Sequence, residues 1–357
     1  MSTNIETHSL PQSKSPIIIA GPCSAESFEQ VMATGKAIVE CPEVEFYRAG
    51  IWKPRTRPDG FEGLGEIALP WLAAMKKETG LKTVVEVATP NHVELCLNAG
   101  IDMIWVGART TANPFSVQEI AEALRGVNIP VLVKNPLHPD LKLWIGALER
   151  INKAGISSLA AVHRGFFTYD NGPFRNLPMW EIPIELKRLI PNLPVITDPS
   201  HISGKRKLIP EVAQKAMDLA MDGLMIETHI NPKNAKTDAA QQLTPQGLKT
   251  LLGSLILRKE YGTKDFESLL EKIRKEVDDI DSELLQILWR RMEKIEEIGR
   301  YKKENDITVL QIDRLRKMMI SRLKTGKELG LDKKFILKLL QLVHKESIQI
   351  QTKIMND

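Results

Sequence analysis

The first two thirds of the chain alternate between short apolar runs and longer stretches with helical spacing. The runs are rich in β-branched residues and have the length of strands buried in a parallel sheet. Eight strand–helix repeats of this kind predict a (β/α)8 TIM barrel of the α/β class at residues 16–260, after a flexible N-terminus at 1–15. The eight runs are 16–23, 44–53, 83–89, 103–109, 130–135, 159–164, 194–201 and 223–229, and the last barrel helix is expected at 244–260.

From about residue 264 the pattern changes to a continuous helical period without proline. Apolar residues recur at steps of three to five from Phe266 to Ile298. They predict one helix of about 40 residues and about 60 Å, followed by shorter helices at about 309–328 and 332–355. A single helix of that length cannot cover its own apolar stripe. We therefore expect a linker at 261–265 and an all-α domain at 266–357 that forms an intertwined homodimer, with a higher oligomer left open.

Residues able to do chemistry lie where the predicted strands end, which is where a TIM barrel builds its active site. One thiol, one imidazole and two carboxylates form a donor set that suits Mn, Fe, Co or Zn. Each of these residues alone is also compatible with simple packing. The candidate metal ligands are Cys23, His201, Glu227 and Asp238.

Basic residues gather at the same ends. Buried cations without partners are costly, so several that converge predict ligands with phosphate or carboxylate groups. For any one of them the alternative is a salt bridge at the barrel rim. The set comprises Arg48, Lys53, Arg55, Arg109, Lys134 and Arg164.

Composition excludes several classes of protein. The net charge of +4 is too small to indicate nucleic-acid binding, and no apolar stretch approaches the roughly 20 residues of a membrane span. The N-terminus lacks a signal-peptide core, and an odd number of cysteines, three, favours the reducing cytoplasm. Cys41 and Cys96 are expected to be packing residues.

The strand-end motifs resemble those of 3-deoxy-D-arabino-heptulosonate 7-phosphate (DAHP) synthases of the compact bacterial subgroup. The resemblance covers residues 16–260 and implies the first reaction of the shikimate pathway, a condensation of phosphoenolpyruvate with erythrose 4-phosphate. The motifs are AGPCS at 20–24, KPRT at 53–56, GAR at 107–109, LVKN at 132–135, HRG at 163–165, DPSH at 198–201 and IETH at 226–229.

The resemblance also implies residue roles. Cys23, His201, Glu227 and Asp238 would hold the metal, while Arg55 and Thr56 would bind the phosphate of erythrose 4-phosphate. Glu86 is a candidate for positioning the water, with a structural role as the alternative. A sister enzyme, 3-deoxy-octulosonate 8-phosphate synthase, is the competing assignment, which the KPRT segment disfavours. Phosphoenolpyruvate would be surrounded by Arg48, Lys53, Arg109, Lys134 and Arg164.

Residues 264–357 resemble the all-helical chorismate mutases, through the segments 273–302 and 344–351. The resemblance implies that Arg274 of the partner chain joins Arg291 and Ser347 on the substrate carboxylates. Lys302 and Gln351 would hydrogen-bond the ether oxygen, and Arg314 would lie near the substrate. Spacing agrees, because Arg274 and Arg291 are roughly 26 Å apart along a helix and cannot share a small ligand within one chain.

Two positions depart from the mutase pattern, since Leu315 and Gln311 stand where relatives place carboxylates. Turnover could then be weak, and the alternative is a non-catalytic domain that senses chorismate or prephenate and dimerises. Feedback by prephenate or chorismate on the barrel, through the helical domain, is a further hypothesis.

Overall fold

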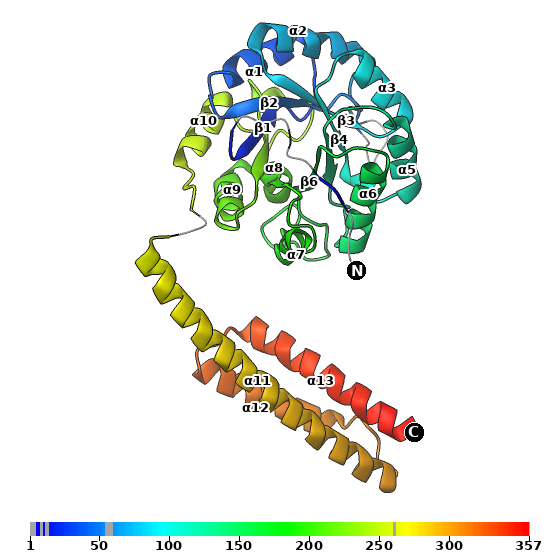
Figure 1. Ribbon diagram of the computed structural model, residues 1–357, viewed down its shortest axis with the longest axis vertical. Helices are drawn as coiled ribbons and strands as arrows, with labels where there is room; N and C mark the ends of the chain where they lie inside the picture. Colours follow the sequence, from blue (N-terminus) through cyan, green and yellow to red (C-terminus); the bar gives the residue numbers. More distant parts are fainter. Residues whose placement is uncertain (1–4, 8–9, 11–13, 54–59, 260–261, 357) are drawn as a thin grey trace. The chain divides into compact units, whose positions relative to one another are not determined.

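The computed structural model describes residues 5–7, 10, 14–53, 60–259 and 262–356. The chain divides into two compact units, Met1–Glu260 and Tyr261–Asp357. Figure 1 shows a barrel wrapped by helices and, separately, three long helices.

The first unit is a closed parallel barrel in which neighbouring strands follow chain order and β8 pairs with β1. The (β/α)8 prediction is thereby confirmed. The strands are β1 Ile17–Gly21, β2 Val44–Ala49, β3 Lys82–Val87, β4 Met103–Val106, β5 Val131–Lys134, β6 Leu159–His163, β7 Val195–Thr197 and β8 Gly223–Glu227.

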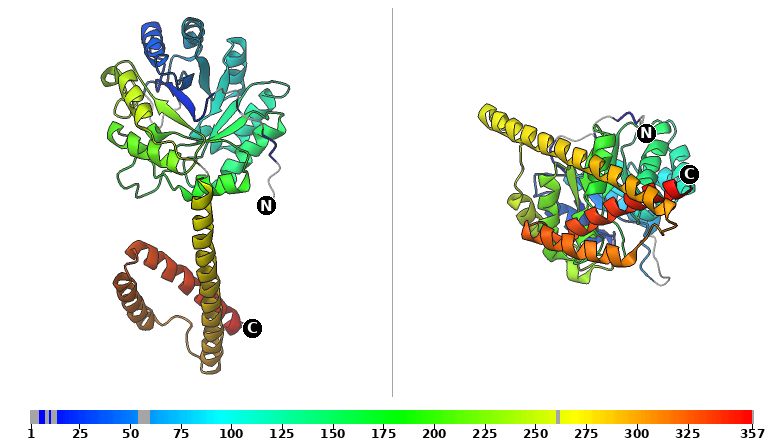
Figure 2. Two further views of the ribbon diagram at one scale, coloured as in Figure 1. Left: turned by 60° about the vertical axis from the view of Figure 1, so that its left-hand side comes forward. Right: turned by 90° about the horizontal axis from the view of Figure 1, so that it is seen from below.

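Helices cover the outside of the barrel (Figures 1 and 2). Several begin at a side-chain N-cap: Thr89, Asn113 and Asp140 each accept a backbone N–H, which typically stabilises a helix by about 1 kcal/mol. The short helices α4 Ala108–Thr111 and α8 Pro199–Ser203 instead follow the ends of β4 and β7 and contribute residues to the cavity there. The other helices of this unit are α1 Phe28–Ile38, α2 Leu69–Thr79, α3 Pro90–Asn98, α5 Pro114–Ala123, α6 Leu141–Lys153, α7 Glu181–Leu189, α9 Ile209–Asp218 and α10 Pro245–Ser254.

One helix boundary was predicted wrongly. The helix expected at 244–260 ends at Ser254, and Leu255 adopts an extended conformation. The apolar residues that suggested a longer helix, Ile256 and Leu257, are more than half exposed. Leucine and isoleucine fit a helical pattern of apolar residues even where the chain is extended. The pattern therefore predicted a helix that continues past its actual end at Ser254.

Alternation along each strand divides the core into two layers. Ile17 and Ile19 belong to the cluster inside the barrel, whereas Ile18 and Ala20 pack outward against the helices. Period-two geometry produces this division. The interior cluster includes Trp105, which lies near the C-terminal end of β4.

The second unit contains α11 Lys264–Glu304, α12 Ile312–Glu328 and α13 Lys333–Asn356. The prediction of one long helix followed by two shorter ones is confirmed, with the middle helix starting three residues later than expected. Gly326 of α12 allows close packing, because a Cβ there would lie 2.3 Å from Cδ1 of Ile336. The N-terminal part of α11 extends beyond the other two helices (Figures 1 and 2).

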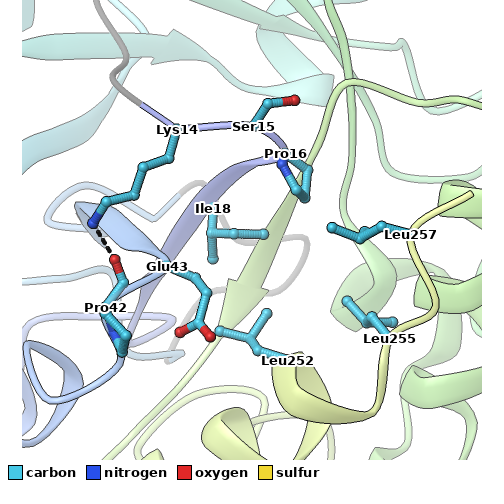
Figure 3. Close-up of a pocket in the computed structure, with 9 residues that line it drawn as sticks. All are labelled: Lys14, Ser15, Pro16, Ile18, Pro42, Glu43, Leu252, Leu255 and Leu257. Carbon is cyan, nitrogen blue, oxygen red and sulfur yellow. Dashed lines mark hydrogen bonds between the residues drawn. The ribbon is translucent and has the colours of Figure 1, made fainter. Parts of the chain in front are cut away.

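A pocket of about 330 Å³ lies beside the start of β1, at the opposite end of the strand from Cys23. Figure 3 shows Lys14 donating to the carbonyl of Pro42 at its edge. Its lining is largely apolar and includes no cluster of chemistry-bearing groups. The lining residues are Lys14, Ser15, Pro16, Ile18, Pro42, Glu43, Leu252, Leu255 and Leu257. Among the described residues, no helix has the length and apolar character needed to cross a membrane.

Candidate active sites

Three of the four predicted metal ligands converge at the C-terminal end of the barrel. One potential ligand atom from each of Cys23, Glu227 and Asp238 lies within 4.8 Å of the others. Cys23 Sγ is 3.3 Å from Asp238 Oδ2. Burial, reinforced by the negative charge of Glu227, raises the pKa of the Cys23 thiol to about 12. The thiol is therefore neutral near pH 7 unless a cation displaces its proton.

His201 lies beside this group rather than within it. It is on α8, beyond the end of β7, and Asp198 caps this helix by accepting from the backbone N–H of His201. The Nδ1 atom of His201 is 2.7 Å from Asp198 Oδ2, and its Nε2 atom is 3.6 Å from Glu227 Oε1. Burial lowers the pKa of His201, although the charges of Asp198 and Glu227 oppose this.

This donor set fits a divalent ion. A carboxylate holds one nitrogen of the imidazole and leaves the other facing a second carboxylate, an arrangement typical of histidines that bind metals. Burial alone would raise the pKa of Asp238, but the charges of Arg175 and His201 hold it well below its usual range. Asp238 is therefore an available anionic ligand.

The loop that carries Asp238 is tied to the end of β1. Gln242 accepts from the backbone N–H of Cys23 at 2.9 Å and donates to the carbonyl of Thr237 at 2.7 Å. The hydroxyls of Ser24 and Thr237 are 2.7 Å apart. Asp238 itself has a left-handed backbone with φ of 48°. These bonds offset the local strain and hold the carboxylate near Cys23.

Of the predicted cations that the structure describes, Arg48 lies beneath the cavity at the strand ends and the others line it. Arg48 is 1% exposed, with Nη2 3.2 Å from Glu227 Oε1 and its guanidinium 5.0 Å from the centre of the Trp105 ring. Lys134 donates to Asp198 at 2.8 Å and also lies over Trp105. Arg48 thus supports the site from below, and it does not line the cavity itself.

A small cavity of about 80 Å³ opens above these residues. Five of its lining side chains are cationic and two are acidic, so the cavity suits an anion. Burial lowers the pKa of Lys134 and lowers that of Arg164 to about 10. An anionic ligand would offset that cost. The lining comprises Lys53, Glu86, Ala108, Arg109, Lys134, Arg164, Arg175, His201 and Asp238.

Glu86 reaches this cavity because Gly107 has no side chain. A Cβ at Gly107 would lie 2.0 Å from Glu86 Oε1. A side chain at this first residue of the GAR segment would therefore displace the Glu86 carboxylate, and Arg109 follows on α4. The other predicted residues of the KPRT segment, Arg55 and Thr56, lie outside the described residues.

Sequence reasoning missed several residues of this site. Asp198 contacts His201 and Lys134, and its position before a proline at the start of a helix was the signal that could have identified it. Arg175 comes from an irregular segment and donates to Asp238 at 2.9 Å. Asn176 accepts from Arg164 at 2.7 Å. Neither of the last two had a sequence signal.

The second unit has its own pocket, of about 310 Å³, between the three helices. Five of the six predicted mutase residues line it: Arg291, Lys302, Arg314, Ser347 and Gln351. Arg291 donates to the hydroxyl of Ser347 at 2.7 Å, and Lys302 donates to the carbonyl of Val309 at 2.6 Å. Gln351 Oε1 is buried and accepts no hydrogen bond within the described chain.

Arg274 does not reach this pocket. It lies on the exposed part of α11, where its Nη1 atom is 3.8 Å from the carboxylate of Glu271. Within one chain it is therefore separate from the other five residues, as the helix spacing predicts.

The pocket of the second unit is cationic. Burial and the charge of Arg322, a lining residue that sequence reasoning missed, lower the pKa of Arg291. His344 also lines the pocket. Leu315 and Gln311 are lining residues too, and the lining side chains that the structure describes include no carboxylate.

Comparisons with known proteins match each unit to a different family. The model described as "DAHP synthetase I family" matches residues 7–261, and the model described as "Chorismate mutase type II" matches residues 273–352.

Individual relatives include heptulosonate enzymes, in agreement with the first match, and a more distant octulosonate enzyme. A phospho-2-dehydro-3-deoxyheptonate aldolase of Thermotoga maritima is 30% identical over 235 residues, covering 66% of this chain and 67% of its own. A crystal structure of a DAHP synthase from Thermotoga maritima has a TM-score of 0.59 at 29% identity, with coverage of 66% and 67%. A 2-dehydro-3-deoxyphosphooctonate aldolase of Wolinella succinogenes is 26% identical, covering 68% of this chain and 99% of its own.

Proposed function

Because the chain belongs to the DAHP synthetase I family and also carries a type II chorismate mutase domain, we propose that it is a bifunctional enzyme of the shikimate pathway. The barrel condenses phosphoenolpyruvate with erythrose 4-phosphate, and the helical unit converts chorismate to prephenate. The observation that carries the first assignment is the cationic cavity directly beside the Cys23, Glu227 and Asp238 group.

In the barrel, the cavity cations bind phosphoenolpyruvate. Lys53, Arg109, Lys134 and Arg164 neutralise its phosphate and carboxylate, and Arg48 supports Glu227 from below. Arg55 and Thr56 are proposed to bind the phosphate of the aldehyde. Holding two polyanions together removes the repulsion that would keep them apart in solution.

Cys23, His201, Glu227 and Asp238 would hold a divalent ion. When bound, such an ion supplies Lewis-acid polarisation of the aldehyde oxygen. C3 of phosphoenolpyruvate attacks the aldehyde carbon, whose oxygen takes up a proton and becomes a hydroxyl. Water adds at C2, and phosphate leaves from that carbon. Glu86 lines the cavity and is the candidate that positions this water.

Metal removal tests this proposal. Treatment with EDTA is expected to abolish heptulosonate formation, and Mn²⁺ or a similar ion should restore it. Cys23→Ala should lose activity while its circular dichroism stays unchanged. Full activity of rigorously metal-free protein would contradict the metal assignment.

The aldehyde substrate separates the proposed activity from that of the octulosonate relatives. Erythrose 4-phosphate should be consumed with phosphoenolpyruvate, and arabinose 5-phosphate should be strongly disfavoured. Arg55→Ala should raise the KM for the aldehyde more than the KM for phosphoenolpyruvate. A preference for arabinose 5-phosphate would reverse the assignment in favour of the sister enzyme.

In the helical unit, Arg291 and Ser347 bind substrate carboxylates, while Lys302 and Gln351 donate to the ether oxygen. The rearrangement is unimolecular, so conformational restriction and charge at that oxygen suffice. The second candidate function is a sensor that binds chorismate or prephenate without turnover. It is favoured by Leu315 and Gln311, which leave no carboxylate among the described lining residues.

Chorismate consumption by the full chain distinguishes the two functions. Turnover that is abolished by Lys302→Ala would establish the mutase. Binding of prephenate with no consumption of chorismate would establish the sensor. Leu315→Glu, which adds a carboxylate to the pocket lining, should raise turnover if the mutase reaction is slow for lack of one.

We also propose that prephenate or chorismate bound in the helical unit regulates the barrel. Couplings of this kind are typically worth about 1–3 kcal/mol, or 5–150-fold in affinity. Heptulosonate synthesis should fall with added prephenate in the full chain and not in a chain that ends near Gly262. Equal insensitivity of both would contradict regulation, and inhibition that survives truncation would place the effector on the barrel.

A further inference from the structure

Gln241 joins two of the proposed metal ligands without being a ligand itself. It follows Asp238 by three residues and is 1% exposed. Its Nε2 atom donates to Glu227 Oε2 at 2.7 Å, and its Oε1 atom accepts from Arg175 Nη1 at 2.7 Å. The same Arg175 nitrogen donates to Asp238 Oδ1 at 2.9 Å. Glu227 and Asp238 are thus connected through Gln241 and Arg175.

The orientation of the Gln241 amide is fixed by its partners. A carboxylate only accepts hydrogen bonds and a guanidinium only donates them, so the amide nitrogen must face Glu227 and the oxygen must face Arg175. A glutamate here would lose the donor toward Glu227, and a methionine of similar length would lose both bonds.

These bonds occupy one oxygen of each carboxylate and leave the other directed at the remaining ligands. With Oε2 of Glu227 held by Gln241, Oε1 is the oxygen that lies 3.6 Å from Nε2 of His201. With Oδ1 of Asp238 held by Arg175, Oδ2 is the oxygen that lies 3.3 Å from Sγ of Cys23. Oε1 of Glu227, which also forms an ion pair with Nη2 of Arg48 at 3.2 Å, therefore faces the imidazole, and Oδ2 of Asp238 faces the thiol.

We propose that Gln241 is a positioning residue of the metal site, which fixes the oxygen that Glu227 presents to a divalent ion and, through Arg175, the oxygen that Asp238 presents. This inference rests on the proposed metal dependence of the barrel. Partners that orient metal ligands are typically worth 10–100-fold in metal affinity.

Direct binding of Co²⁺ to the full-length, metal-free protein tests the role of Gln241. The wild type should bind Co²⁺ with a thiolate-to-cobalt charge-transfer band. Gln241→Met should bind 10–100-fold more weakly, with an altered cobalt spectrum and an unchanged circular dichroism spectrum of the metal-free protein. Gln246→Met, an exposed glutamine on α10, is the matched control and should equal the wild type.

A second variant keeps the test decisive if Gln241→Met does not fold. Arg175 has a side chain that is 46% exposed, so Arg175→Met removes the same link at the cavity rim. It should also weaken Co²⁺ binding. In the double variant the two losses should be less than additive in free energy, because both act through one network.

Co²⁺ binding by the wild type and by the variants distinguishes failure of the metal dependence from failure of the role of Gln241. If the wild type binds no divalent ion, the metal dependence and this inference both fall. If the wild type binds Co²⁺ and the Gln241→Met and Arg175→Met variants bind it equally well, only the inference falls.

Discussion

At the scale of single residues, burial sets the protonation state of His163. His163, at the end of β6, donates from Nε2 to the carbonyl of Pro178 at 2.6 Å, while Nδ1 is buried without a partner in the described chain. Burial, with the charge of Arg164 adding to it, lowers the pKa of His163 to about 4. A proton on Nδ1 would be a buried, unpaired charge, so the native ring is neutral.

His163 is expected to make the fold sensitive to acid. Its pKa is lower in the folded state than the ordinary 6.5, so between pH 6.5 and 4 the unfolded chain binds more protons. The free energy of unfolding should therefore fall, by up to roughly 3 kcal/mol, as the pH decreases through that range. Urea unfolding at several pH values measures it.

A glutamine at this position can still donate to the Pro178 carbonyl and does not titrate. His163→Gln should therefore reduce the slope of the unfolding free energy against pH between 6.5 and 4, while His138→Gln, at an exposed histidine, serves as the control. A slope in His163→Gln equal to that of the wild type would show that other groups cause the acid sensitivity.

At the scale of secondary structure, α11 leaves a row of apolar side chains exposed in a single chain. Its N-terminal half exposes Ile273, Val277, Ile280 and Leu284 by 48–63% each. These positions recur at three- and four-residue steps and share one face of the helix. Such a stripe is expected to be covered by a second copy of the chain, as the proposed homodimer requires.

Ile280→Glu should convert that dimer to a monomer, because it places a charge in the middle of the buried stripe. Ser282→Glu adds the same charge two residues further, on the opposite side of the helix, and should leave the dimer intact. Analytical ultracentrifugation measures both. An unchanged mass for Ile280→Glu would argue against dimerisation through this stripe.

At the scale of the whole molecule, the proposed dimer completes the mutase pocket. Arg274 lies apart from the pocket of its own chain, and the other five predicted residues line it. The proposed mutase reaction therefore needs a second chain to supply the remaining arginine.

Subunit mixing tests whether the pocket is shared. Arg274→Ala and Arg291→Ala should each nearly abolish mutase activity as homodimers. A heterodimer has one intact site of two, so an equilibrated equimolar mixture should recover about a quarter of wild-type activity. No recovery despite demonstrated exchange of subunits would show that each chain builds its site alone.

Local periodicity was sufficient to predict both architectures. Apolar runs such as 16–23 and 223–229 determine which residues can form buried strands, and the uninterrupted pattern after residue 264 determines a long helix. Boundaries were predicted less well, since the apolar pattern continues after Ser254 although Ile256 and Leu257 are exposed and lie beyond the end of the helix. Strand-end chemistry was predictable for the same reason, because parallel strands bring their ends together.

Only the tertiary structure could reveal the contacts that orient those residues. Asp198 holds Lys134 from 64 residues away, and Arg175 reaches Asp238 across 63 residues from an irregular segment. Such contacts depend on how loops from different strands meet, which has no local period in the sequence. Gln241 is polar, buried and three residues from a proposed ligand, yet its sequence neighbours give no sign of its partners. The sequence by itself thus determined that the reactive side chains lie at the strand ends. The packing of distant loops against one another decided which of their atoms are in contact.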